Sequence, residues 1–67
     1  MNIEKYSCYK YIIHKQPDSK GYTYEILLEN NYLGYPESIE SDEYFDAEQK
    51  ARFAVIGHID LLENGEG

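Results

Sequence analysis

The sequence predicts one small α+β domain, in which a three-stranded antiparallel sheet is followed by a single C-terminal helix packed across one face of the sheet. Three observations predict this fold. Side chains from Tyr22 to Asn30 alternate between apolar and polar, which is typical of a strand with one buried face. Residues 47–63 carry an apolar stripe at helical spacing. The chain has only 67 residues, so we expect one domain spanning 1–67 with the element order β-β-β-α.

The first strand is expected over residues 7–15, because this segment is rich in β-branched and aromatic residues. The sequence leaves open which face of this strand is buried. One face would carry Tyr9, Tyr11 and Ile13, and the other Cys8, Lys10, Ile12 and His14. The first set is the more apolar. Residues 16–21 contain Pro, Asp, Ser and Gly, which predicts a loop.

The second and third strands are expected over 22–30 and 31–40. Asparagine tolerates the positive φ of a two-residue hairpin turn, so Asn30 and Asn31 are predicted to form that turn. Pro36 lacks a backbone N–H and should interrupt the third strand or place it at the sheet edge. The strand is expected to resume around Ile39.

The helix is expected over about 47–63. Asp46 and Gln49 have the spacing of a capping box, in which the first side chain bonds to a backbone N–H of the first turn. Asn64 and Gly65 predict the left-handed helix stop, and 64–67 should form a frayed tail. The predicted buried stripe consists of Ala47, Ala51, Ala54, Val55, His58, Ile59, Leu61 and Leu62. Within it, His58 is expected to be a neutral core histidine that bonds to a tyrosine hydroxyl or a carbonyl group.

The charge of the chain limits its partners. Thirteen acidic residues against six basic ones give a formal net charge of −7, which repels nucleic-acid phosphates and anionic lipids. No apolar run approaches the length of a membrane span or an export signal, and Cys8 is the only cysteine. We therefore expect a cytoplasmic protein that binds neither membranes nor nucleic acid.

The sequence does not predict an enzyme. It contains no nucleophile elbow, no glycine-rich phosphate loop and no paired metal-ligand spacing. We expect no catalytic residues, no metal and no cofactor.

The side of the helix opposite the buried stripe predicts an interaction surface. Phe53 and Ile56 project there beside Gly57 and Asp60. Single exposed apolar residues are ordinary, and the N-terminal segment could also cover them. The alternative is a self-association or partner surface anchored by Phe53 and Ile56, with Gly57 allowing a second backbone to approach. A glycine inside a helix costs about 1 kcal/mol relative to alanine, which favours a role for it.

An acidic surface is predicted around the start of the helix, and its residues are Glu37, Glu40, Asp42, Glu43 and Glu48. Such a run is usually solvated, with acids placed favourably at a helix N-terminus. It could also imitate a nucleic-acid backbone in the basic groove of a partner. Calcium binding is a competing reading, but the run lacks the regularly spaced aspartates and the loop glycine of an EF-hand, which argues against a dedicated metal site. Eight tyrosines allow a third reading, base stacking on an open sheet face, although the charge argues against it.

The predicted β-β-β-α order resembles part of the double-stranded-RNA-binding domain, in topology alone. The first helix and the basic contacts of that family are missing, so the resemblance implies no RNA binding. The acidic make-up is also similar to that of small accessory proteins of phages and mobile elements. Our leading hypothesis is a non-catalytic, self-associating protein-interaction module that presents acidic and tyrosine-rich surface to a protein partner. A homodimer would form through Phe53 and Ile56 or through the edge strand near Pro36. The alternative is an acidic nucleic-acid mimic that inhibits a DNA- or RNA-handling protein.

Overall fold

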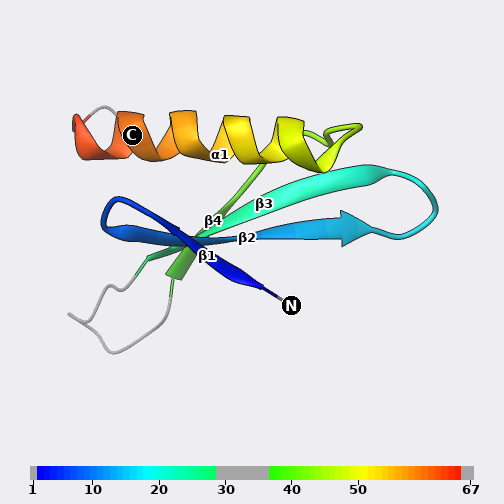
Figure 1. Cartoon of the computed structure of the whole chain (residues 1–67), viewed down its shortest axis with the longest axis horizontal. Coiled ribbons are helices and arrows are strands. Elements are labelled where there is room, and N and C mark those ends of the chain that lie inside the picture. Colours follow the sequence, from blue (N-terminus) through cyan, green and yellow to red (C-terminus); the bar gives the residue numbers. More distant parts are fainter. Residues whose placement is uncertain (1, 29–36, 66–67) are drawn as a thin grey trace.

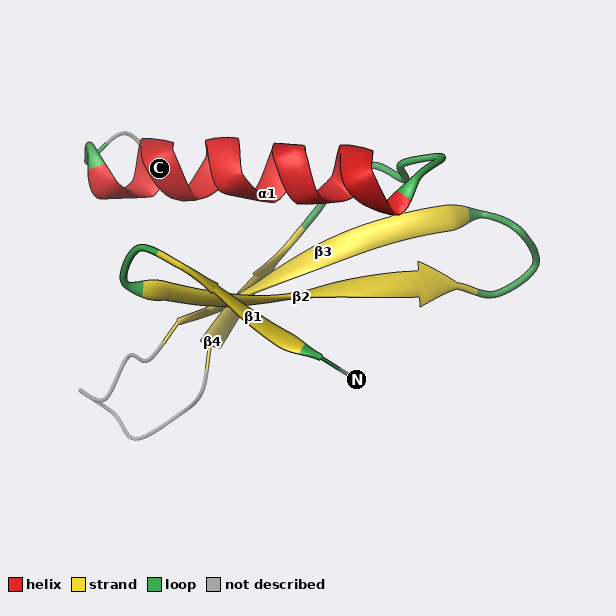
Figure 2. Cartoon of the chain, in the orientation of Figure 1, coloured by secondary structure: helices red, strands yellow, loops and turns green. Residues whose placement is uncertain are grey.

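The protein, described here by a computed structural model over residues 2–28 and 37–65, has an α+β fold in two layers. Four antiparallel strands in the order β1-β2-β3-β4 form the sheet, and helix α1 lies across one of its faces (Figures 1 and 2). The elements are β1 Ile3–Tyr6, β2 Tyr9–Gln16, β3 Gly21–Leu28, β4 Glu37–Glu40 and α1 Glu48–Glu63. The predicted antiparallel sheet and C-terminal helix are confirmed, but the sheet has four strands rather than three.

Strand β1 is the element that the sequence analysis missed. It pairs with β2 in a tight hairpin whose register runs from Ile3 opposite Ile12 to Tyr6 opposite Tyr9. The two-residue turn is Ser7–Cys8, and Ser7 takes the positive φ of 56°. Such turns usually use asparagine, aspartate or glycine, so this hairpin carries no recognisable turn signal. Residues 7–8 therefore form the turn of this hairpin, and the strand that was expected over 7–15 begins at Tyr9 instead.

The hairpin of β2 and β3 forms the centre of the sheet, with Tyr11 opposite Ile26 and Gln16 opposite Gly21. The predicted loop between them is confirmed as a turn. Gly21 has a φ of +108°, and a Cβ atom built on it would lie 2.3 Å from the Phe45 carbonyl oxygen. That oxygen accepts a hydrogen bond from the Tyr22 N–H at 2.7 Å. Gly21 is required here because the segment leading into α1 passes so close to β3.

Strand β4 pairs with the other side of β3, and Ile39 lies opposite Ile26. The expected resumption of the strand around Ile39 is confirmed. The predicted turn at Asn30–Asn31, the return segment 32–35 and the interruption at Pro36 all lie outside the described residues.

Helix α1 begins one residue later than expected. Its N-cap is Ala47 in an extended conformation, with no side-chain cap hydrogen bond. The predicted capping box is therefore wrong, and the Asp46 carboxylate instead pairs with Lys50 at 2.9 Å. The predicted helix stop is confirmed, because Gly65 has a φ of +78° and its N–H donates to the Leu62 carbonyl oxygen at 3.1 Å.

The core lies between α1 and the central strands. Ala51, Val55 and Ile59 are fully buried at successive turns of the helix. Val55 and Ile59 form one cluster with Tyr11 and Ile26 of the sheet. The face of β2 that carries Tyr9, Tyr11 and Ile13, the more apolar of its two faces, therefore lies under the helix. Within the described residues, no helix is long and apolar enough to cross a membrane.

Candidate functional site

The outer face of α1 carries an apolar row that nothing in the described chain covers. Phe53 is 65% exposed and Leu61 is 48% exposed. Gly57 lies between them, and a Cβ atom built on it would meet no atom within 4 Å. Residues four apart on a helix are neighbours on its surface, so Phe53, Gly57 and Leu61 form one row, which we call the outer stripe. Leu61 was expected in the buried stripe, and that prediction is wrong.

Two residues of the predicted interaction surface are engaged within the chain. Ile56 is partly buried and packs against the core with Tyr6. Asp60 is exposed and accepts a hydrogen bond from the Tyr6 hydroxyl at 3.0 Å. The unexpected strand β1 explains both contacts, because it widens the sheet under this side of the helix. Phe53 and Gly57 are therefore the members of the predicted surface that are exposed and have no side-chain hydrogen bond to β1.

Strand β1 is also tied to the helix by an ion pair. Arg52 donates from Nε to Glu4 Oε1 at 3.0 Å and from Nη2 to Glu4 Oε2 at 2.8 Å. Arg52 also contacts Glu48 at 2.8 Å, and the Tyr11 hydroxyl donates to Glu4 at 3.0 Å. The hydrogen bonds from Arg52 are the main reason that the pKa of Glu4 falls below its ordinary value.

The predicted acidic residues do not form one row among the described side chains. Glu48 pairs with Arg52 on the helix side of the sheet. Glu40 lies opposite Glu25, on the face away from α1. Asp42 and Glu43 are exposed in the segment between β4 and α1, and the Glu37 side chain lies outside the described part. The structure thus separates Glu40 from Glu48 by the thickness of the sheet.

The tyrosines of the strands lie under the helix rather than on the open side of the sheet. Tyr11 is 3% exposed and Tyr24 is 9% exposed, and Tyr6 and Tyr9 pack against the same core. The Tyr24 hydroxyl lies 2.8 Å from Nδ1 of His58, which confirms the expected tyrosine partner of that histidine. Burial raises the pKa of Tyr24, and Asp42 and Glu43 raise it further. The predicted tyrosine-bearing open face is therefore absent from the described strands.

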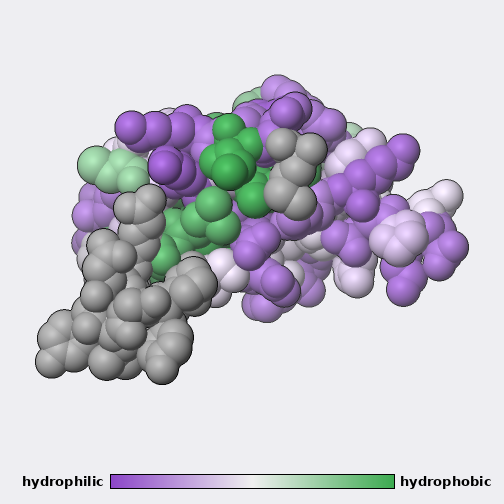
Figure 3. All heavy atoms as spheres, turned by 90° about the horizontal axis from the view of Figure 1, so that it is seen from below, coloured by the Kyte–Doolittle hydropathy of each residue, from purple (hydrophilic) through white to green (hydrophobic). Residues whose placement is uncertain are grey.

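We call the sheet face away from α1 the open face. Figure 3, which views the molecule from below, shows an apolar area on this face with polar side chains beside it. By strand alternation this face carries Ile3 and Ile12, which lie opposite each other, and Leu27. Beside them lies a cavity of about 400 Å³ between β2, β3, β4 and the segment leading to α1. The sequence analysis missed this cavity, because only the strand register brings its residues together.

Glu25 and Glu40 give the cavity two carboxylates, and His14 lines it beside them. His14 Nε2 lies 2.9 Å from Glu25 Oε1. Hydrogen bonds from His14 and then from Ser38 lower the pKa of Glu25. Among the described residues, no group of three or more His, Cys, Asp or Glu side chains is arranged to hold a metal ion.

Comparison with known proteins gives no relative for this arrangement. No family model, no curated protein and no solved structure matches the chain. The outer stripe of α1 and the cavity of the open face are therefore the two features of the molecule that point to a function.

Proposed function

We propose that this protein is a non-catalytic interaction module of the cytoplasm, which binds a protein partner and self-associates through the outer stripe of α1. The observation that carries the self-association is the row Phe53, Gly57 and Leu61, in which two exposed apolar side chains flank a glycine with open space above it. Solvent-exposed phenylalanine and leucine gain free energy on burial. A glycine between them lets another backbone come close.

A second copy of the chain is the occupant that this row fits. A two-fold axis through Gly57 would align two α1 helices antiparallel and place Phe53 of each copy against Leu61 of the other. Such an interface is self-complementary, as two-fold symmetry requires. Rows of residues four apart are also the ridges by which helices commonly pack. Antiparallel alignment further brings opposite ends of the two helix dipoles together.

The net charge of −7 on each copy opposes this association. The repulsion is screened over a Debye length of about 10 Å at 0.1 M salt. We therefore expect the dimer to become tighter as salt concentration rises. A nucleic-acid mimic would behave in the opposite way with its basic partner, because its complex would weaken with salt.

Sedimentation equilibrium across a range of protein concentrations tests the proposal. Wild type should self-associate in the micromolar to millimolar range, and Phe53→Asp should raise the dissociation constant by at least about tenfold. Tyr44→Asp is the matched control, because Tyr44 is also 56% exposed but lies outside α1. Circular dichroism verifies that both variants fold.

Equal dissociation constants for wild type and Phe53→Asp would contradict the proposal, as would a wild type that stays monomeric at high salt and high concentration.

We do not propose the nucleic-acid mimic as a second function. It requires the acidic side chains to share one surface, whereas Glu40 and Glu48 lie on opposite sides of the sheet.

A further inference from the structure

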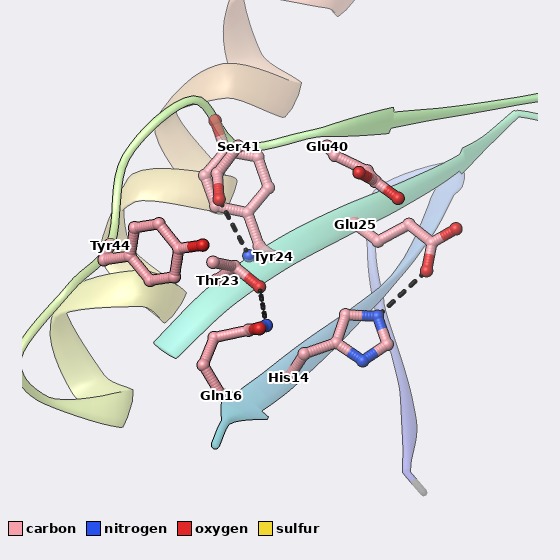
Figure 4. Close-up of a pocket in the computed structure, with 8 residues that line it drawn as sticks. All are labelled: His14, Gln16, Thr23, Tyr24, Glu25, Glu40, Ser41 and Tyr44. Carbon is pink, nitrogen blue, oxygen red and sulfur yellow. Dashed lines mark hydrogen bonds and ion pairs between the residues drawn. The ribbon is translucent and has the colours of Figure 1, made fainter. Parts of the chain in front are cut away.

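The cavity of the open face has two carboxylates at one wall. Glu25 and Glu40 lie directly opposite each other on β3 and β4, so their side chains project to the same side of the sheet. Figure 4 shows them with His14, which bonds to Glu25 on the side away from Glu40. Like charges directly opposite each other destabilise an antiparallel pair. A cation bound between them would remove that repulsion.

The other walls contribute polar atoms and one aromatic ring. Gln16 donates to the Thr23 hydroxyl at 2.7 Å, and the Tyr44 hydroxyl points toward Thr23 (Figure 4). Tyr44 comes from the segment between β4 and α1 and is 56% exposed. Among the described residues that line the cavity there is no lysine or arginine. Even with His14 protonated, Glu25 and Glu40 would leave one net negative charge.

The size of the cavity and the side chains that line it favour an organic cation over a metal ion as the ligand. A volume of about 400 Å³ is far larger than one bare ion needs, and no described group of three ligating side chains is available. A guanidinium group is planar and presents five N–H donors in a fork that matches carboxylates. It also stacks on aromatic rings. Glu25 and Glu40 offer the carboxylate contacts at one end of the cavity, and Tyr44 lines its other end (Figure 4).

We propose that the cavity between β2, β3, β4 and the β4–α1 segment binds the guanidinium group of an arginine side chain from a partner protein. This inference rests on the proposed function in one respect, namely that the ligand belongs to a protein. It does not rest on the outer stripe, because the cavity lies on the other side of the sheet from α1. The net charge of −7 favours the approach of a basic partner and disfavours anionic ligands.

The test is an NMR titration of the ¹⁵N-labelled protein with the capped tripeptide acetyl-Gly-Arg-Gly-amide. We expect saturable amide shifts at millimolar peptide, centred on His14, Thr23, Glu25 and Glu40. The matched peptide with citrulline in place of arginine has nearly the same shape without the charge, and it should bind at least about tenfold more weakly. The lysine peptide should bind several-fold more weakly, because an ammonium group lacks the forked geometry.

Variants locate the binding site. Glu40→Gln should weaken binding of the arginine peptide by about three- to tenfold, since it removes one charge-assisted contact, made by an exposed carboxylate. Glu43→Gln makes the same change in net charge at an exposed residue that does not line the cavity. Its dissociation constant should stay within about twofold of wild type.

Three outcomes would overturn the inference: equal binding of the arginine and citrulline peptides, equal losses in Glu40→Gln and Glu43→Gln, or no saturable shifts. Free L-arginine distinguishes the source of the cation. It carries the same net charge of about +1 as the capped peptide, so it should bind no more tightly, and tighter binding would instead indicate a small-molecule ligand. Failure here is separable from failure of self-association, because Phe53→Asp should lose dimerisation and still bind the arginine peptide.

Discussion

The ion pair between Arg52 and Glu4 is expected to hold strand β1 onto the helix. Arg52→Met keeps the aliphatic stem and removes the charge. The pair is bidentate, with side chains 25% and 32% exposed, so its contribution should lie between that of exposed pairs, about 0.2–1 kcal/mol, and buried ones, about 3–5 kcal/mol. We expect a coupling energy of about 1.5 kcal/mol, which corresponds to a fall in melting temperature of about 6–12 °C in a domain of this size.

A double-mutant cycle with Glu4→Gln isolates this energy from the second contact of Arg52 with Glu48. Urea unfolding followed by circular dichroism measures the four free energies of unfolding. Lys50→Met is the control, because its pair with Asp46 is exposed by 64% and 76% and should be worth less than about 0.5 kcal/mol.

The same coupling should depend on pH in one direction. Arg52 lowers the pKa of Glu4 in the folded protein. The contribution is therefore fully present above the unfolded-state pKa of about 4.3 and is lost as the pH falls through the lower folded-state pKa. A coupling energy below about 0.3 kcal/mol at neutral pH, or one that does not decline in acid, would refute this reasoning.

Two further predictions concern the attachment of β3 to the rest of the fold. Gly21→Ala should destabilise the protein by about 2–3 kcal/mol, because the new Cβ atom would strain a positive φ and meet the Phe45 carbonyl oxygen; a loss below 1 kcal/mol in urea unfolding would contradict the close approach. Tyr24→Phe should cost about 1 kcal/mol, because it leaves Nδ1 of His58 without the tyrosine hydroxyl. A loss below about 0.3 kcal/mol in urea unfolding would show that this hydrogen bond does not stabilise the fold.

The elements that the sequence predicted well are those whose burial repeats along one segment. Strand β3 alternates cleanly because one of its faces lies under the helix, and the pattern of 22–30 reproduces Gly21–Leu28 closely. Helix α1 shows Ala51, Val55 and Ile59 at four-residue spacing because that row faces the sheet. In both cases the contact with the core repeats along one segment, so the local sequence pattern is enough to predict it.

The features that the sequence did not predict depend on contacts between distant segments. Strand β1 places the charged Glu4 toward the helix, so its four residues lack an apolar face, and Ser7 turns the chain without the usual turn residue. Asp46 has the spacing of a helix cap, but Ala47 is the N-cap residue and the Asp46 carboxylate forms an ion pair with Lys50. The cavity is assembled by pairing Glu25 with Glu40 across two strands, which no single segment reveals.

In the proposed dimer two copies of α1 meet antiparallel at Gly57, and disulfide cross-linking can detect this contact. Gly57→Cys and Gln49→Cys would each be made together with Cys8→Ser, because Cys8 is exposed. A disulfide requires Cα atoms within about 7 Å. In the proposed dimer the two copies of position 57 meet that limit, whereas those of position 49 lie about 20–25 Å apart along the helices.

We predict that mild oxidation at micromolar protein converts Gly57→Cys rapidly to a covalent dimer and leaves Gln49→Cys largely monomeric, with the difference abolished by Phe53→Asp. Equal and slow cross-linking at both positions would contradict the proposed self-association, and faster cross-linking at position 49 would contradict the antiparallel arrangement.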